Sequence, residues 1–315
     1  MTTATIGLGC MGMSGMYGAT NDDDGVATIQ AAIERGVTLL DTGDFYGMGH
    51  NELLVRRALE GRRDRVQLSV KFGALRGPDR SWLGSDTRPA AVKTFAAYSL
   101  KRLGVDVIDI YRPARLDPAV PIEDTIGAIA ELVTAGYVRQ IGLSEVGADT
   151  IRRAHAVHPI ADLQIEYSLI SRAPEAKLFP LLRELGIGAT LYGVLSRGLL
   201  GGSTPAAGDF RGRLPRFAAE NRATNAPIVA AVRAFGAARG MTSGQVAIAY
   251  VCAKQPGFLP VIGARTVAQL DDALGALAHP LSPADVAALE AAVPPDAIAG
   301  TRYDAHQMQH LDSER

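Results

Sequence analysis

Three side chains early in the sequence could together transfer a proton. Asp41 and Lys71 each stand at the end of a short β-rich run, and Tyr46 follows Asp41 closely. A phenol titrates at about 10, so it is a weak acid at neutral pH unless a nearby cation favours its phenolate form. Lys71 can supply that cation, and the carboxylate of Asp41 can keep a buried ammonium charged. The three residues therefore predict an acid–base relay.

Such a relay suits the reduction of a carbonyl group. A hydride arrives at the carbonyl carbon while a proton must reach the developing alkoxide. We predict that Tyr46 is the proton donor and that Lys71 and Asp41 tune it. The alternative is that the two charges form a plain ion pair at the rim of the fold and that the tyrosine only packs.

A second set of residues, in the later half of the chain, fits a cofactor with two phosphates. Tyr192 offers a flat ring, and the following run Gly193–Gly198 offers backbone amides on which a pyrophosphate could rest. Arg265 stands at the start of a later helical segment and suits a terminal phosphate. This pattern favours NADPH over NADH, whereas the alternative for Arg265 is a solvated arginine at a helix end.

These residues need a frame that brings the ends of several strands together. Short β-rich runs alternate with longer amphipathic segments along almost the whole chain, which is typical of βα units around a parallel sheet. Eight such runs predict an α/β fold of the closed (β/α)₈ type, the TIM barrel, with its active site at the carboxyl ends of the strands. The predicted strands are Thr5–Leu8, Val37–Leu40, Val66–Lys71, Val107–Tyr111, Val138–Gly142, Asp162–Ile165, Ile187–Leu191 and Leu259–Ile262.

No linker divides the chain, so we predict one domain over residues 1–315. Ser282–Val293 predicts an additional helix, and the polar tail Pro294–Arg315 is expected to be irregular, so that residues 282–315 pack on the barrel as a C-terminal helix and tail. Ser203–Asn225 is rich in Gly, Pro and Arg and predicts a long surface loop that could act as a lid. Trp82, in the predicted loop Gly73–Arg88 at the barrel mouth, is a candidate substrate wall, or else a packed surface aromatic.

The run Gly7–Gly12 has the GxGxxG spacing of a Rossmann dinucleotide fingerprint and follows a plausible strand. In a Rossmann unit the third glycine lies in a helix whose amino end holds the pyrophosphate. The turn-rich run Met13–Gly18 follows instead. A first barrel strand that ends in a glycine-rich loop therefore fits better.

The composition is that of an ordinary soluble globular protein, with 47% hydrophobic and 21% charged residues. The net charge of −1 gives no attraction to nucleic acid or to an anionic membrane, and no apolar run approaches the roughly 20 residues that span a bilayer. Cys10 and Cys252 lie far apart and the first residues lack a signal-like segment, so we expect a reducing, cytoplasmic location. His155 and His158 lack a third ligand, and we predict no metal site.

Four motifs resemble the aldo-keto reductases, and they occur in that family's order along essentially the whole chain. They are Gly7–Met13, Asp41–Gly47, Ile141–Glu145 and Gln164–Ser168. The resemblance implies reduction of a small-molecule aldehyde or ketone with NADPH as the cofactor. It also implies that Asp41, Tyr46 and Lys71 are three members of a catalytic tetrad.

The resemblance further implies which residues bind the coenzyme. Ser144 and Gln164 match residues that hold the carboxamide of nicotinamide, and Tyr192 matches the ring that stacks on it. Glu145 stands where many relatives have asparagine. The residues that match the pyrophosphate loop and the adenosine and 2′-phosphate site are Leu195, Arg197, Gly198, Arg265 and Gln269. Asp272 keeps the acidic character expected before an asparagine, although Ala273 takes the place of that asparagine.

The largest departure from the family pattern is at Ala114, where the family usually has histidine as the fourth tetrad member. That imidazole helps to orient and polarise the carbonyl, and removal of a positioned donor commonly costs on the order of 10² in rate. Arg112 or Arg115 could substitute, or a water could fill the space. Alternatively, with Ala114 and Arg115 as substrate-binding residues, the enlarged pocket could admit a bulky ketone. The same departure motivates a different function, that of an NADPH-binding redox-sensing or regulatory subunit with slow turnover.

Overall fold

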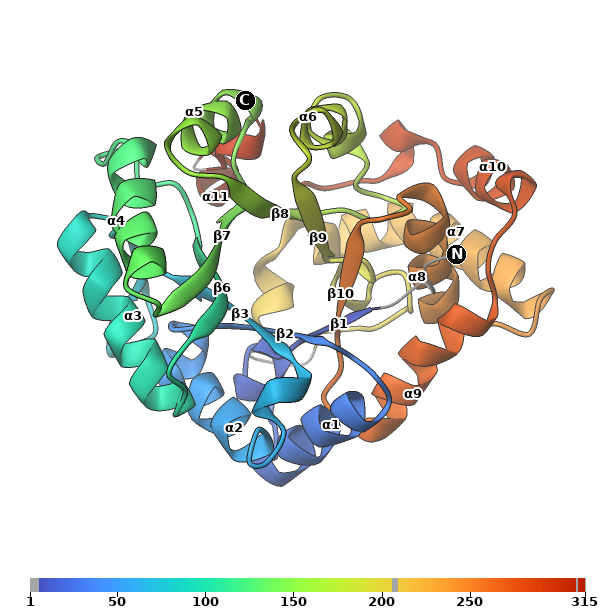
Figure 1. Ribbon diagram of the computed structural model, residues 1–315. Coiled ribbons are helices and arrows are strands. Elements are labelled where there is room, and N and C mark those ends of the chain that lie inside the picture. The colour runs from blue at the N-terminus through green and yellow to red at the C-terminus, as the bar shows by residue number, and fades with distance from the viewer. Residues whose placement is uncertain (1–5, 206–208, 310, 315) are drawn as a thin grey trace.

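The computed structural model describes residues 6–205, 209–309 and 311–314. Its eight parallel barrel strands are β1 (Gly7–Gly9), β2 (Leu39–Gly43), β3 (Gln67–Phe72), β6 (Ile108–Pro113), β7 (Val138–Ser144), β8 (Ile160–Glu166), β9 (Gly188–Tyr192) and β10 (Leu259–Gly263). They close into a barrel in the order β1-β10-β9-β8-β7-β6-β3-β2 (Figure 1). The predicted (β/α)₈ barrel is confirmed, and the Rossmann alternative is excluded.

Every barrel strand runs one to three residues further toward its carboxyl end than predicted. Asp41 therefore lies within β2 rather than after it, directly opposite Ser69 of β3. The predicted first strand began at Thr5, which lies outside the described residues. The predicted strands ended too early because the polar residues at their carboxyl ends are typical of loops. In a closed barrel such residues can remain hydrogen-bonded in the sheet with their side chains pointing inward.

The outer helices cover the barrel, as Figure 1 shows. The first begins where the side chain of Asn21 accepts hydrogen bonds from the backbone of Asp23 and Asp24, and acidic residues in its first turn suit the helix dipole. The helices between the strands are α1 (Asp22–Glu34), α2 (His50–Ala58), α3 (Pro89–Leu103), α4 (Ile122–Thr134), α5 (Ala148–Val157), α6 (Leu178–Leu185), α8 (Ser243–Lys254) and α9 (Val267–Gly275). Among the described residues no helix has both the length and the apolarity for crossing a membrane.

The interior of the barrel changes from apolar to polar toward the carboxyl ends of the strands. Leu39, Ile110 and Val261 form a small core cluster of their own, apart from the main core between the strands and the helices. Side chains alternate between the two faces of a strand, so the next inward residues on β2 and β6 are Asp41 and Arg112. The polar layer that contains Asp41 and Arg112 therefore lies on the apolar cluster of Leu39, Ile110 and Val261.

Two predicted loops contain regular structure. Gly73–Arg88 includes a two-stranded hairpin of β4 (Ala74–Arg76) and β5 (Trp82–Ser85) outside the barrel. The last part of Ser203–Asn225 belongs to helix α7 (Ala219–Ala237), and residues 206–208 of that segment lie outside the described residues. The loop prediction was wrong for this last part, because the alanine-rich sequence from 218 onward favours a helix.

The C-terminal region begins with the additional helix that the sequence predicts, α10 (Pro283–Ala292), whose capping box is formed by Ser282 and Asp285. The tail is not wholly irregular, since it includes the short helix α11 (Ala305–Gln309). Figure 1 shows α11 beside α5. The backbone N–H of Gly147, at the start of α5, donates to the side chain of Asp312 at 2.8 Å, which fixes the end of the tail there.

Candidate active site

Asp41 is the centre of a buried hydrogen-bond network inside the barrel. Lys71 Nζ donates a hydrogen bond to one carboxylate oxygen of Asp41, and both side chains are almost fully buried. The other oxygen, Oδ2, accepts from Ser69 Oγ at 2.8 Å and from Gln164 Nε2 at 2.7 Å. Three side chains therefore donate hydrogen bonds to this carboxylate, and the ion pair also fixes the position of the lysine.

The electrostatics favour the ionised form of this pair. Burial on its own would raise the pKa of Asp41, but the charges of Lys71 and Arg112 hold that pKa below its usual range. Burial lowers the pKa of Lys71, and the carboxylate of Asp41 opposes that shift. Asp41 and Lys71 thus need each other, because either charge alone would be unpaired in the barrel interior.

Tyr46 lies against the same pair. The residue is 6% exposed, and Lys71 Nζ lies 5.2 Å from the ring centroid. Burial raises the pKa of Tyr46 well above its usual value, and the charge of Asp41 adds to this, so the phenol stays protonated. The positive charge that most opposes the shift is Arg115, whereas Lys71 was expected from the sequence.

The structure separates the two arginines that flank the missing histidine. Arg112 is fully buried, and its guanidinium pairs with Asp162 and donates to Ser69 Oγ, Thr190 Oγ1 and the carbonyl of Leu143. These contacts leave Arg112 within the polar layer of the barrel. Arg115 instead folds back toward the mouth, where Nη1 donates to the carbonyl of Ala114 at 2.7 Å and Nη2 to the hydroxyl of Tyr303 at 3.3 Å.

The residues expected at the nicotinamide end lie on three adjacent strands. Ser144 on β7 pairs in register with Gln164 on β8, and both side chains are buried. Tyr192 ends β9, and its hydroxyl donates to Glu145 Oε1 at 2.7 Å. The backbone of Glu145 has a positive φ of 55°, which is uncommon for a residue other than glycine or asparagine. The ring of Tyr192 is thus tied to Glu145.

Two tail residues at this site were missed by the sequence analysis. Arg302 forms an ion pair with Glu145, and the hydroxyl of Tyr303 lies 3.0 Å from that of Tyr192. A buried acid requires a counter-ion. The glutamate at position 145, where relatives have asparagine, was therefore a signal that a cation had to lie nearby, although nothing in the sequence indicated which one.

The loop after β9, expected to hold pyrophosphate, turns sharply. Arg197 and Gly198 both have positive φ, and a Cβ on Gly198 would come within 2.9 Å of the Cβ of Ser203. Only glycine fits there. Leu195 precedes this turn, and the guanidinium of Arg197 pairs with Glu166 at 3.1 Å. The backbone of the loop is therefore rigidly placed, while the arginine side chain reaches toward the tail.

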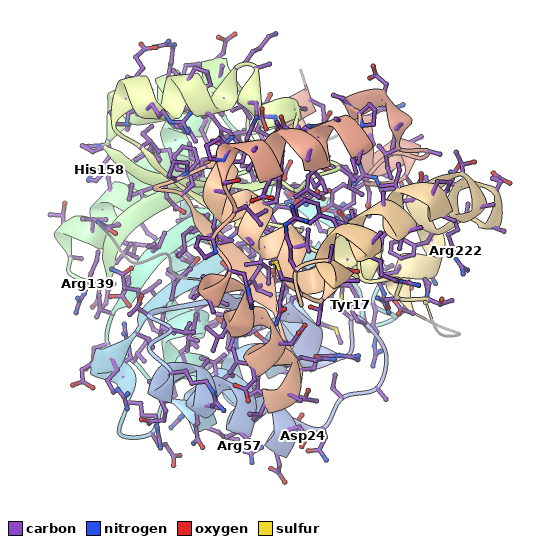
Figure 2. The ribbon with its side chains drawn as sticks, turned by 90° about the vertical axis from the view of Figure 1, so that its right-hand side faces the viewer. Tyr17, Asp24, Arg57, Arg139, His158 and Arg222 are labelled. Carbon is purple, nitrogen blue, oxygen red and sulfur yellow. The ribbon has the colours of Figure 1, made fainter. Side chains whose placement is uncertain are left out.

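The residues expected at the adenosine end border a hollow of about 210 Å³ at the start of α9. Arg265 lines this hollow, and its Nη1 donates a hydrogen bond to the carbonyl of Tyr17 at 3.0 Å (Tyr17 is labelled in Figure 2). The backbone N–H of Arg265 donates to Gln269 Oε1. Asp272 lies outside this hollow and accepts hydrogen bonds from Thr242, the N-cap of α8. The other residues that line the hollow include Asn21, Asp24 and Thr266.

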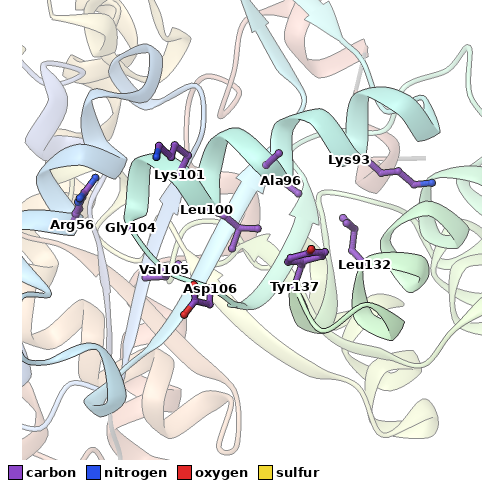
Figure 3. Close-up of a pocket in the computed structure, with 11 residues that line it drawn as sticks. Arg56, Lys93, Ala96, Leu100, Lys101, Gly104, Val105, Asp106, Leu132 and Tyr137 are labelled. Carbon is purple, nitrogen blue, oxygen red and sulfur yellow. The ribbon is translucent and has the colours of Figure 1, made fainter.

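Other candidate features lie away from this centre. Trp82 is 40% exposed on the β4–β5 hairpin, where the guanidinium of Arg76 lies 5.4 Å from its ring centroid. A larger hollow of about 640 Å³ lies on the outer surface along α3, as Figure 3 shows, and contains no member of the network around Asp41. Within the described ranges no group of three or more His, Cys, Asp or Glu could hold a metal ion.

Comparisons with known proteins identify the family of the chain. Residues 5–294 match the profile of the Aldo/keto reductase family. Probable aldo-keto reductase 1 from Glycine max is 42% identical over 307 residues, which cover 95% of this chain and 88% of the relative.

Solved structures give the same answer. A glycerol dehydrogenase from Gluconobacter oxydans is similar with a TM-score of 0.84 at 26% identity, covering 94% of both chains. An aldo/keto reductase from Klebsiella pneumoniae, in complex with NADP and acetate, gives a TM-score of 0.74 at 27% identity, covering 95% of this chain and 94% of the other. The chain therefore belongs to the aldo/keto reductase family of oxidoreductases.

Proposed function

We propose that this protein uses NADPH to reduce an aldehyde or ketone on a small molecule, with Tyr46 as the proton donor. The observation that carries the proposal is the buried Asp41–Lys71 pair, which contacts the Tyr46 ring on one side and Gln164 on the other. Such a perturbed, charged cluster at the carboxyl ends of barrel strands is typical of an active site. The two free thiols, Cys10 and Cys252, support a reducing, cytoplasmic setting.

The coenzyme fits the residues present. The hollow beside Arg265 suits a phosphate on the adenosine, the glycine turn at Gly198 suits a pyrophosphate, and the ring of Tyr192 suits the nicotinamide. When bound, NADPH supplies the hydride. Tyr46 holds the proton at its hydroxyl, Lys71 and Asp41 fix the charge next to it, and the closed barrel floor excludes water from below.

Arg115 is the residue that we assign to the role of the missing histidine. Its charge acts on the pKa of Tyr46 in the direction opposite to burial, and it is tethered at the backbone of Ala114 itself. Arg112 cannot take this role, because its guanidinium is bound within the barrel. A charged donor beside the phenol would stabilise the developing alkoxide.

Arg115→Ala is expected to lower kcat/KM by roughly tenfold to a hundredfold, because a charged donor is lost from the carbonyl site. Adding Ala114→His to that variant is expected to restore part of the loss for small aldehydes, since the imidazole then occupies the vacated space. Steady-state kinetics with small aldehydes and bulky ketones measure both effects. An unchanged kcat/KM in Arg115→Ala, with the protein folded, would show that this arginine has no part in the reaction.

Arg265→Met is expected to raise the Kd for NADPH by roughly tenfold to a hundredfold and to leave the Kd for NADH unchanged. The reason is that a hydrogen bond to a charged group contributes about 1.5–3 kcal/mol, and only NADPH carries the extra phosphate. Isothermal titration calorimetry with both coenzymes measures the difference. Equal weakening for the two coenzymes would assign Arg265 to a part of the coenzyme that both share.

Oxidation of NADPH by a panel of aromatic aldehydes and bulky ketones tests the function as a whole. Carbonyl-dependent oxidation supports a reductase. Tight binding of NADPH without oxidation by any carbonyl would instead support a redox-sensing or regulatory subunit. Ala114 in place of the tetrad histidine motivates this alternative. If neither binding nor turnover occurs, both functions are excluded.

A further inference from the structure

Glu145 is a buried acid whose hydrogen-bonding capacity is fully used. Oε1 accepts from the backbone N–H of Glu166 at 2.9 Å, from the hydroxyl of Tyr192 at 2.7 Å and from Arg302 Nη1 at 3.0 Å. Oε2 accepts from Arg302 Nη2 at 2.6 Å and from Ser313 Oγ at 2.7 Å. This carboxylate is therefore occupied with holding Tyr192 and the tail.

Arg302 supplies the charge that makes this arrangement possible. Its guanidinium meets Glu145 through two nitrogens, and it also contacts Glu314 at 2.7 Å and Glu166 at 3.7 Å. Its side chain is only 8% exposed. Two-pronged arginine–carboxylate contacts are strong and geometrically specific. Arg302 therefore fixes both the charge and the orientation of Glu145.

The tail that carries Arg302 crosses the end of the barrel where the nicotinamide residues lie. At one side the carbonyl of Arg302 accepts a hydrogen bond at 3.1 Å from Arg197, in the loop after β9. At the other side Asp312 and Ser313 are bound by Gly147 and Glu145, after β7. The tail thus spans the ends of β7, β8 and β9, the three strands that bear the expected nicotinamide contacts.

We propose that Arg302 is a positioning residue of the nicotinamide pocket, which acts through Glu145 to hold the ring of Tyr192 in place and so sets the affinity for the nicotinamide end of the coenzyme. This inference rests on the proposed function. The inference extends that function by coupling a residue of the tail to a pocket formed by the barrel strands.

The charges around Glu145 predict what happens when Arg302 is removed. Arg302 and Arg115 together hold the pKa of Glu145 at about 2, against burial, which is the largest influence and raises it. Arg115, Ser313 and Tyr192 remain in a variant without Arg302, but the main counter-ion is gone. The pKa of Glu145 in the folded variant then rises, so that the carboxyl is neutral at low pH and becomes a buried charge without its main counter-ion as pH rises.

The test measures coenzyme affinity by calorimetry between pH 6 and pH 9 in wild type, Arg302→Met and the double variant Arg302→Met/Glu145→Gln. In wild type the Kd for NADPH is expected to be independent of the titration of Glu145. In Arg302→Met it is expected to rise by about tenfold or more, and to worsen with increasing pH. The double variant removes both charges but keeps an acceptor for Tyr192, so its Kd is expected to return close to that of wild type without the added pH dependence.

Two controls separate positioning from a general loss of structure. 2′-Phospho-ADP-ribose lacks the nicotinamide ring, so its Kd is expected to be the same in Arg302→Met as in wild type. Arg153→Met removes an arginine that meets Glu123 through two nitrogens on the exterior of the barrel, and it is expected to change neither Kd. If Arg302→Met does not fold, Arg302→Lys can replace it, because lysine keeps the charge but loses the two-pronged contact. The same difference between the Kd for NADPH and the Kd for 2′-phospho-ADP-ribose is then expected, with a smaller magnitude.

The outcomes distinguish this inference from the function on which it rests. An Arg302→Met protein that binds NADPH as wild type does at every pH overturns the inference alone. Equal weakening toward NADPH and 2′-phospho-ADP-ribose also overturns it, because Arg302 would then support the fold rather than the nicotinamide pocket. A wild-type protein that binds neither ligand overturns the proposed function.

Discussion

Tyr46→Phe is expected to lower kcat for carbonyl reduction by about 10²–10⁴, which is the range that a positioned proton donor contributes. The substitution removes only the hydroxyl. The ring keeps its edge-on contact with Phe45, at 4.8 Å between centroids, and its place beside Lys71. Stopped-flow measurement of NADPH oxidation in a single turnover reports the chemical step directly.

The Kd for NADPH and the thermal midpoint of Tyr46→Phe serve as controls, and both are expected to change little. Burial raises the pKa of Tyr46, so in wild type the rate is not expected to fall through ionisation of this phenol anywhere near neutral pH. A Tyr46→Phe protein that still reduces carbonyls at the wild-type rate would show that another group donates the proton.

Asp41→Asn is expected to destabilise the fold by about 3–5 kcal/mol at pH 7, because it leaves Lys71 as an unpaired charge inside the barrel. Burial already lowers the pKa of Lys71, and without the carboxylate it falls further. A lysine whose pKa is lower in the folded state than in the unfolded state destabilises the fold most at pH values where it must carry a proton. The variant is therefore expected to recover toward wild type as pH rises.

Urea unfolding at pH 7 and pH 9 measures this prediction. The double variant Asp41→Asn/Lys71→Met removes both charges and is expected to be more stable at pH 7 than Asp41→Asn alone. Glu184→Gln breaks the exposed pair with Arg152 and is the matched control, with little expected change. A loss of stability in Asp41→Asn that does not depend on pH would show that the lost hydrogen bonds of Asp41, rather than the charge on Lys71, govern stability.

The barrel and the central pair could be predicted because both follow from local pattern. Alternation along a strand places Asp41 on the same inner face as Leu39 in β2, and Arg112 on the same inner face as Ile110 in β6. Inward polar residues can therefore be recognised once the strands are found. The strand ends could not be found so easily. Residues such as Ser144 and Glu166 are polar and would be solvated in most folds, and only closure of the barrel keeps them in the sheet.

The tail contacts could not be predicted because they depend on the path of the whole chain. Glu145 and Arg302 are 157 positions apart, and no periodic pattern connects a tail with a strand end. The identity of the residue at 145 indicated a need for positive charge, but several arginines could have met it. The sequence also could not decide between Arg112 and Arg115 as the substitute for the histidine. The two arginines are close in sequence, but their side chains lie in different layers of the site.

The β4–β5 hairpin gives the protein a built-in optical probe. Trp82 is the single tryptophan of the sequence, and it begins β5 in the hairpin that follows the carboxyl end of β3. Indole emission overlaps the absorption band of reduced nicotinamide, so a coenzyme bound at the mouth would quench this one fluorophore by energy transfer. Any change in the emission can be assigned to a single position, and arrival and departure of the coenzyme can be followed in real time without attaching a dye.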